Sequence, residues 1–234
     1  RQMCIRDSNN ANTVAAFHFA ETTLTQDSSN SSLSANGAIT VQKAGLIGES
    51  AVFSGTPLAI SANPALKVSS VSGYTWSAWI KPTSLTEVAT LYSQSDSISL
   101  KIDAQKLSLN VGGNAVTGGD IKATVWQHVA FTIGGAKASL YVNGIQVGSG
   151  PATDLEVDAD VKVGEAFVGE MDELLIENVA RSDSWIKLAA SSQGVDSKLI
   201  TVAAGEGDGE EEGGEPNYLG ILINSLTLDA VIVI

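Results

Sequence analysis

The feature that most constrains the fold of this chain is a two-residue repeat of apolar and polar side chains. It is clearest in DLEVDADVKV, residues 154–163, where five apolar residues alternate with four acids and a lysine. This period is typical of a β-strand that buries one face and exposes the other. Similar short runs occur along the chain as TVAAFHF, YTWSAWIK, SISLKID, KLSLNVG, WQHVAFTI, ASLYVNG and GEMDELLIE.

Local turn and cap signals add a hairpin and one helix to these strands. The Asn143-Gly144 pair lies between two alternating runs, and Asn-Gly favours the type I′ turn of an antiparallel hairpin. The stretch SDSWIKLAASS predicts a short C-terminal helix, which begins at Ser182 or Asp183 as N-cap and places Trp185, Leu188 and Ala189 on one face. The sequence therefore predicts an all-β fold, a two-sheet antiparallel jelly-roll sandwich with one short C-terminal helix.

Composition divides the chain into four segments. Residues 1–8, RQMCIRDS, are similar to translated adapter sequence, and we expect them to be non-native; residues 9–204 are the predicted sandwich. Residues 205–216 hold six acids, five glycines and a proline, a composition that predicts a disordered acidic linker. Residues 217–234 are apolar again and end inside the run DAVIVI. We expect them to begin a truncated membrane-associated segment, so that the whole chain is a piece of a longer protein.

Charge and cysteine content argue against several classes of function. The chain has 13 Lys and Arg against 26 Asp and Glu, a formal net charge of −13, and nucleic-acid binding requires a basic surface. One cysteine cannot form an intrachain disulfide, and the presence of only two histidines argues against a histidine-based zinc site.

The order of several motifs resembles that of a known family. FHFAETTLTQDSSNSS, GLIGESAVFSG, YTWSAWIKPTSL, WQHVAFTI, LYVNGIQVG and VGEMDELLIENVARSDSWIKLAA follow one another over roughly 14–192, as in laminin-G-like (concanavalin A-like) jelly-roll domains. The resemblance implies two antiparallel sheets, one of them concave. It also implies binding of carbohydrates, proteins or matrix components, often with calcium at a sheet rim and usually without catalysis.

The C-terminal stretch NYLGILINSLTLDAVIVI resembles the start of the membrane part of MotA/TolQ/ExbB proton-channel proteins. This resemblance implies a bacterial, extracytoplasmic domain, periplasmic or at the cell surface, that is tethered to the membrane through its C-terminal continuation. The expected partner is then a glycan or an envelope protein. A secreted adhesion module is the alternative for the same order of segments.

The stretch GEMDELLIE raises the question of catalysis, because jelly-roll glucanases use the pattern Glu-x-Asp-x-Glu, sometimes with one residue inserted. Glu170 and Asp172 fit its first half and share one face of a strand. The third carboxylate is missing, since positions 174 and 175 are leucine, while Glu173 is expected on the opposite face and Glu177 about 16 Å from Asp172. We therefore expect no enzyme activity, with a jelly-roll glycoside hydrolase as the alternative.

Two sets of residues are the candidates for binding. Trp79 or Tyr92 is the candidate platform for stacking on a sugar, although indoles on such strands usually belong to the core. Asp27 and Asn30 offer hard oxygen ligands, as calcium prefers. The family resemblance, in which the first and last strands are neighbours, implies that Asp172 approaches them, which predicts a calcium site. The alternative for the loop is an Asx turn, in which Asp and Asn bond nearby backbone groups. Calcium is the one cofactor that the sequence suggests.

Overall fold

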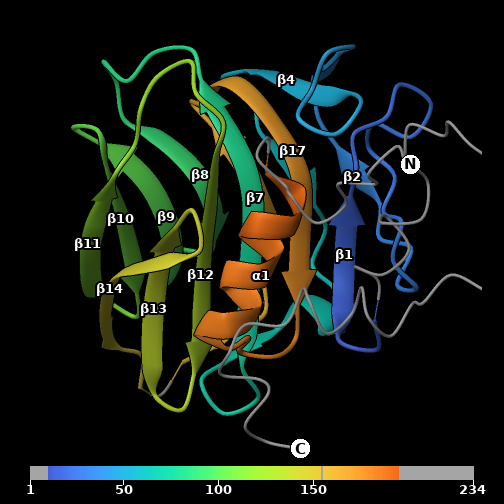
Figure 1. The fold of residues 1–234 in the computed structure, drawn as a ribbon. Coiled ribbons are helices and arrows are strands. Elements are labelled where there is room, and N and C mark those ends of the chain that lie inside the picture. Colours follow the sequence, from blue (N-terminus) through green and yellow to red (C-terminus); the bar gives the residue numbers. More distant parts are fainter. Residues whose placement is uncertain (1–9, 154, 195–234) are drawn as a thin grey trace, which may run out of the picture. The chain divides into compact units, whose positions relative to one another are not determined.

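The computed structural model describes residues 10–153 and 155–194, which form two antiparallel β-sheets packed face to face (Figure 1). The predicted non-native segment, the acidic linker and the apolar tail lie outside the described residues. The all-β, two-sheet antiparallel sandwich with one short helix is confirmed.

The first sheet has eight strands, in the order β14-β13-β12-β7-β17-β4-β3 with β1 paired to β17. Their bounds are β1 Thr13–Phe17, β3 Thr40–Gln42, β4 Ser50–Ser54, β7 Tyr74–Pro82, β12 Gln127–Gly134, β13 Lys137–Val142, β14 Ile145–Pro151 and β17 Val168–Glu177. The second sheet has seven strands, in the order β11-β10-β9-β8-β16-β5-β2. Their bounds are β2 Ala35–Asn36, β5 Leu58–Ile60, β8 Ala89–Gln94, β9 Ile98–Asp103, β10 Lys106–Val111, β11 Asn114–Asp120 and β16 Val161–Glu165.

Four further elements complete the described part of the chain. Strands β6 (Val68–Ser69) and β15 (Glu156–Val157) form a separate two-stranded sheet, and η2 (Pro64–Leu66) is a short 3-10 helix. The α-helix α1 (Asp183–Gln193) lies across the outer face of the eight-stranded sheet, in front of β7 in Figure 1.

The hairpin and the helix start are confirmed. Asn143 and Gly144 have φ values of 50° and 78° between β13 and β14, the positive values that a type I′ turn requires. Ser182 is the N-cap of α1, and its side chain accepts a hydrogen bond from the backbone N–H of Trp185. The predicted helix face is wrong, because α1 buries Ile186 and Ala190 and leaves Leu188 58% exposed.

The run 154–163 is not one strand. It is divided between β15 and β16, and the bend between them lets the Asp160 carboxylate accept a hydrogen bond of 2.7 Å from Ala62 N. The expected alternation holds within β16, where Val161 and Val163 are buried and Lys162 is exposed.

An aromatic cluster fills the space between the two sheets. Tyr74, Trp76 and Phe131 of the first sheet meet Tyr92 of the second with ring centroids 5.2 to 6.2 Å apart. The phenol oxygens of Tyr74 and Tyr92 are 2.9 Å apart, and the Tyr92 hydroxyl donates to Gln94 Oε1 at 2.9 Å. The Gln94 amide in turn donates to two backbone carbonyls, so this buried chain of polar groups is bonded from end to end.

We predict that Tyr92→Phe lowers the free energy of unfolding by about 1 to 3 kcal/mol, because it removes the shared partner of two buried polar groups. Tyr141→Phe is the matched control. The Tyr141 hydroxyl donates to the carboxylate of Asp183, which is exposed, so that acceptor can bond water once the hydroxyl is removed and we expect a smaller loss. Denaturant unfolding of both variants checks this, and equal losses would contradict it.

Candidate functional site

Strand β17 lies in the interior of the eight-stranded sheet, and on one side it has two successive neighbours, β4 and β1. Along its other side it pairs with β7. On the divided side, residues 168–171 pair with β4, whereas β1 pairs with the stretch from Leu174 to Glu177. A β-bulge lies where the neighbour changes: the register with β7 shifts between Asp172 and Leu175, and Glu173 has a φ of 49°.

The first two carboxylates of β17 bond its neighbours at this seam. Glu170 receives the Lys81 ammonium of β7 at 2.9 Å and the Ser50 hydroxyl of β4 at 3.1 Å. Asp172 is fully buried, and its carboxylate accepts hydrogen bonds from Ile47 N at 3.0 Å and from Glu173 N at 2.9 Å. Through these bonds the loop between β3 and β4 is attached to β17.

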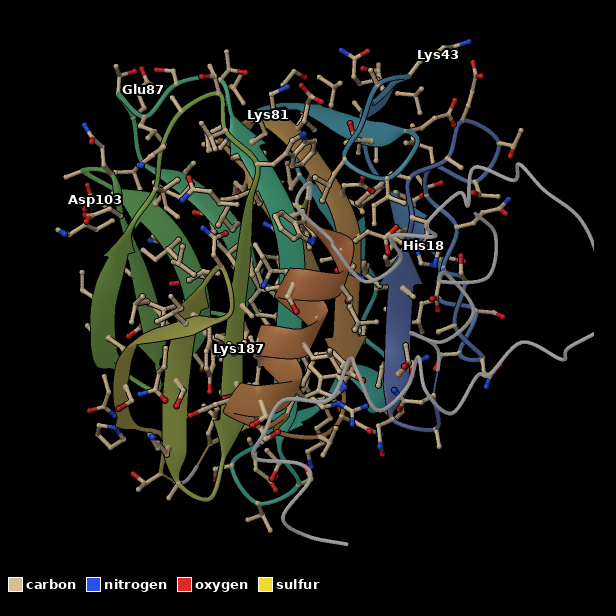
Figure 2. The ribbon with its side chains drawn as sticks, in the orientation of Figure 1. His18, Lys43, Lys81, Glu87, Asp103 and Lys187 are labelled. Atoms are coloured by element: carbon tan, nitrogen blue, oxygen red, sulfur yellow. The ribbon has the colours of Figure 1, made fainter. Side chains whose placement is uncertain are left out.

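The last two carboxylates bond segments that flank β1 and α1. Both oxygens of Glu173 lie 3.0 Å from Nδ1 of His18, which follows β1 (Figure 2). Glu177 is fully buried and pairs with Arg181, just before α1, and with the Asn10 amide at 3.2 Å. The Arg181 guanidinium also lies 4.8 Å from the centre of the Trp185 ring. Each of the four acids of GEMDELLIE therefore has a structural partner.

The bulge determines which positions of β17 correspond to the three acids of the glucanase pattern. Glu170 and Asp172 share the outer face, as predicted, but the extra residue turns Glu173 to His18 rather than into the core. In the form of the pattern with one inserted residue, the third acid belongs at 175, and Leu175 lies there beside Ser77. Helix α1 covers the same face, where Ile186 packs on Ala130 and Tyr141.

Burial changes the protonation of the groups at the seam. It raises the pKa of Asp172 to about 7, against the opposing effect of its backbone donors. For His18 burial lowers the pKa, but the hydrogen bond and the negative charge of Glu173 outweigh it, so that the net pKa is above its ordinary value. Asp27 and Asp172 also contribute negative charge near this imidazole.

The two candidate stacking residues are both buried. Tyr92 has no exposed surface and belongs to the aromatic cluster between the sheets. Trp79 is 5% exposed, lies across from Asp172 and His128, and donates from Nε1 to Gln193 at the end of α1. In this structure, neither ring offers a face to a sugar.

Of the three calcium candidates, Asp27 and Asp172 both lie near His18, but their carboxylates already accept hydrogen bonds from backbone N–H groups of the protein. Asp27 accepts from Ala16 N, Leu33 N and both the N–H and the hydroxyl of Ser29, at 2.7 to 2.9 Å, as in the Asx-turn alternative. Asn30 is exposed. Over residues 10–153 and 155–194, no group of three or more His, Cys, Asp or Glu side chains is arranged to hold a metal ion. Calcium binding stays a prediction.

The outer face of the seven-stranded sheet carries a polar hollow of about 460 Å³, which we call the trough. Its lining residues are Thr90, Ser93, Ser95, Asp96, Ser99, Lys101, Asn110, Asp160, Lys162 and Glu165. Cross-strand pairing orders them into two rows that cross the sheet. One row contains Lys162, Ser93, Ser99 and Asn110, and the other contains Glu165, Thr90 and Lys101.

The trough results from the same alternation that predicts the strands. In SISLKID, residues 97–103, the buried Ile98, Leu100 and Ile102 alternate with the outward Ser99 and Lys101. Short hydroxyl side chains from β8 lie between longer side chains from β9, β10 and β16. Sequence reasoning missed this site because β16 lies far from β8 in the chain, and the sheet order alone makes them neighbours.

Comparison with known proteins gives one family match. Residues 53–187 match the model of the concanavalin A-like lectin/glucanases superfamily. No curated protein matches the chain.

Several solved structures share the fold. The chain is similar to the binding domain of Paraclostridial Mosquitocidal Protein 1, with 16% identity and a TM-score of 0.66 over 77% of this chain and 52% of that one. It is also similar to Domain 4 of AbnA, a GH43 extracellular arabinanase from Geobacillus stearothermophilus, in complex with arabinotriose (22% identity, TM-score 0.62, 76% of this chain and 98% of that one). A third is the botulinum neurotoxin serotype D binding domain (17% identity, TM-score 0.62, 78% and 52%).

At these identities the likeness establishes the fold alone. The chain spans about half the length of the mosquitocidal and neurotoxin chains and nearly all of the arabinanase domain.

We predict that Arg181→Ala lowers the free energy of unfolding by about 3 kcal/mol or more, because it leaves the fully buried Glu177 without its cation. Lys106→Ala, which breaks the exposed pair with Asp120, is the control and should leave stability essentially unchanged. Denaturant unfolding measures both. If the two variants lost equal stability, Glu177 would not depend on Arg181.

We predict that the folded state is less stable at pH 8 than at pH 5.5. The folded pKa of Asp172, about 7, exceeds its ordinary 3.8, so folding favours the protonated acid, and stability is lost as pH rises through 7. The raised pKa of His18 acts in the same direction, with stability lost above its ordinary 6.5. The Asp172 contribution is about 1 to 2 kcal/mol over this range.

Denaturant unfolding of wild type and Asp172→Asn at both pH values isolates this contribution, since the asparagine does not titrate. Asp120→Asn serves as the control because the Lys106 hydrogen bond holds the pKa of Asp120 below its ordinary value, so that it stays ionised throughout. An equal pH dependence in wild type and Asp172→Asn would show that Asp172 does not titrate in this range.

Proposed function

Because the chain belongs to the concanavalin A-like lectin/glucanases superfamily, we propose that it is a non-catalytic recognition domain that binds a glycan in the trough. The observation that carries the proposal is the lining of this hollow. All ten of its residues are polar or charged. Seven of them come from strands that one sheet holds in fixed register, and Ser95, Asp96 and Asp160 come from the adjoining loops.

The chemistry of the trough suits the many hydroxyl groups of a saccharide. Thr90, Ser93 and Ser99 can each donate and accept a hydrogen bond, Asn110 offers an amide, and the carboxylates accept from sugar hydroxyls. Pre-formed polar groups on rigid strands lose little conformational entropy on binding. Domain 4 of AbnA, which shares the fold, is described in complex with arabinotriose, and this supports a saccharide ligand here.

The arrangement of β17 supports a function without catalysis. The nucleophile and the acid of a retaining glycosidase lie about 5 Å apart in an open site. Here Glu170 is paired with Lys81, Asp172 is buried, and Leu175 occupies the third position of the pattern. The mosquitocidal and neurotoxin structures with the same fold are also binding domains.

The extracytoplasmic location and the membrane tether belong to this proposal as well. They rest on residues 205–234, which lie outside the described residues, and on the resemblance of that tail to channel proteins. Within the described ranges, no helix has the length and apolar character needed to cross a bilayer. An envelope protein remains the alternative partner to a glycan.

We predict that Ser99→Trp, which fills the floor of the trough, weakens saccharide binding at least tenfold. Calorimetric titration with arabinotriose, xylotriose and cellotriose tests this against Ser149→Trp, a control on the exposed strand β14 of the other sheet. Binding that survives Ser99→Trp, or is lost equally in Ser149→Trp, would place the ligand elsewhere.

A further inference from the structure

The charged residues of the trough differ in how far they are already used within the protein. Asp160 accepts a hydrogen bond of 2.7 Å from Ala62 N. Lys162 and Glu165 face each other at 3.9 Å, with both side chains about half exposed. These groups are therefore partly neutralised or fixed in place before any ligand arrives.

Lys101 is different. It forms no ion pair with any of the residues for which the structure gives positions. Its strand places it directly across from Thr90 on one side and Ser108 on the other, so its nearest cross-strand neighbours carry hydroxyls. The trough thus holds an ammonium group, in a fixed strand position, that lacks an acidic partner.

The lining also restricts where binding energy can come from. It contains no aromatic side chain among the residues described, so stacking on a sugar ring does not contribute there. Hydrogen bonds and charge remain, and hydrogen bonds to charged groups are about twice as strong as neutral ones. Lys101 is then the group best able to discriminate between saccharides.

We propose that Lys101 makes the trough selective for a saccharide that carries an anionic group, a carboxylate or a sulfate ester. This inference rests on the proposed function, because it names the ligand class of the same site. The anionic group would contact the Lys101 ammonium, and neighbouring sugar hydroxyls would bond Ser99 and Asn110, which face each other across β9 and β10.

The acids of the trough set the direction of the ligand. Two of the three acids are at one end of the trough, since Asp96 lies in the turn between β8 and β9 and Asp160 just before β16, while Lys101 is toward the other end. The third acid, Glu165, shares the row of Lys101 with one residue between them, and it lies 3.9 Å from the Lys162 ammonium. Carboxylates at the first end accept hydrogen bonds from neutral sugar hydroxyls and repel a second anion. The favoured ligand therefore carries its acidic group at one end and neutral sugar at the other.

The test compares xylotriose with a xylotriose that bears one glucuronic acid branch, and with one that bears one sulfate ester. By calorimetric titration, wild type should bind at least one charged form about tenfold more tightly than xylotriose, and added salt should reduce this preference. The two charged probes separate a carboxylate ligand from a sulfate ligand.

Lys101→Ala should abolish the preference, so that the charged and neutral saccharides bind with affinities within about twofold of each other, while Lys101→Arg should retain it. Lys137→Ala, which removes an exposed lysine from β13 of the other sheet, is the charge-matched control and should keep the preference. Equal binding of neutral and charged probes, or a preference that persists in Lys101→Ala, would overturn the role of Lys101 while saccharide binding stands. Absence of binding by any of the saccharides would overturn the proposed function as well.

Discussion

The structure depends on how one strand accommodates four carboxylates. β17 runs through the eight-stranded sheet, and burying a carboxylate is costly unless it is paired or accepts hydrogen bonds. Each acid is paired with a different segment: Glu170 with β7 and β4, Asp172 with the loop before β4, Glu173 with the end of β1, and Glu177 with the start of α1. The bulge at Glu173 makes this arrangement fit, since it lies where the strand exchanges β4 for β1 as its neighbour.

As a result, the two outer faces of the sandwich differ in how their polar side chains are used. On the eight-stranded sheet, the acids are used for structure and α1 covers much of the face. On the seven-stranded sheet, short hydroxyl side chains and charged groups remain available around the trough.

Much of the fold follows from local sequence, whereas the site does not. The two-residue period, the Asn143-Gly144 turn and the Ser182 cap each depend on neighbouring residues, and all three are confirmed. The leucine at 175 also argues against catalysis from sequence alone. The partners of the four acids, and the neighbours that form the trough, are far apart in the chain. Periodicity likewise indicates that the Tyr92 side chain lies on one of the two faces of its strand. It does not indicate that this face is the buried one, where the Tyr92 hydroxyl meets that of Tyr74.

We propose that the acids of β17 hold the fold together while recognition takes place on the opposite sheet. Chemical-shift mapping of the backbone amides during titration with a bound saccharide distinguishes the two sheets. We predict the largest shifts in β8, β9 and β16, around Ser93, Ser99 and Lys162, with β17 unaffected. Shifts concentrated at Glu170 and Asp172 instead would contradict it.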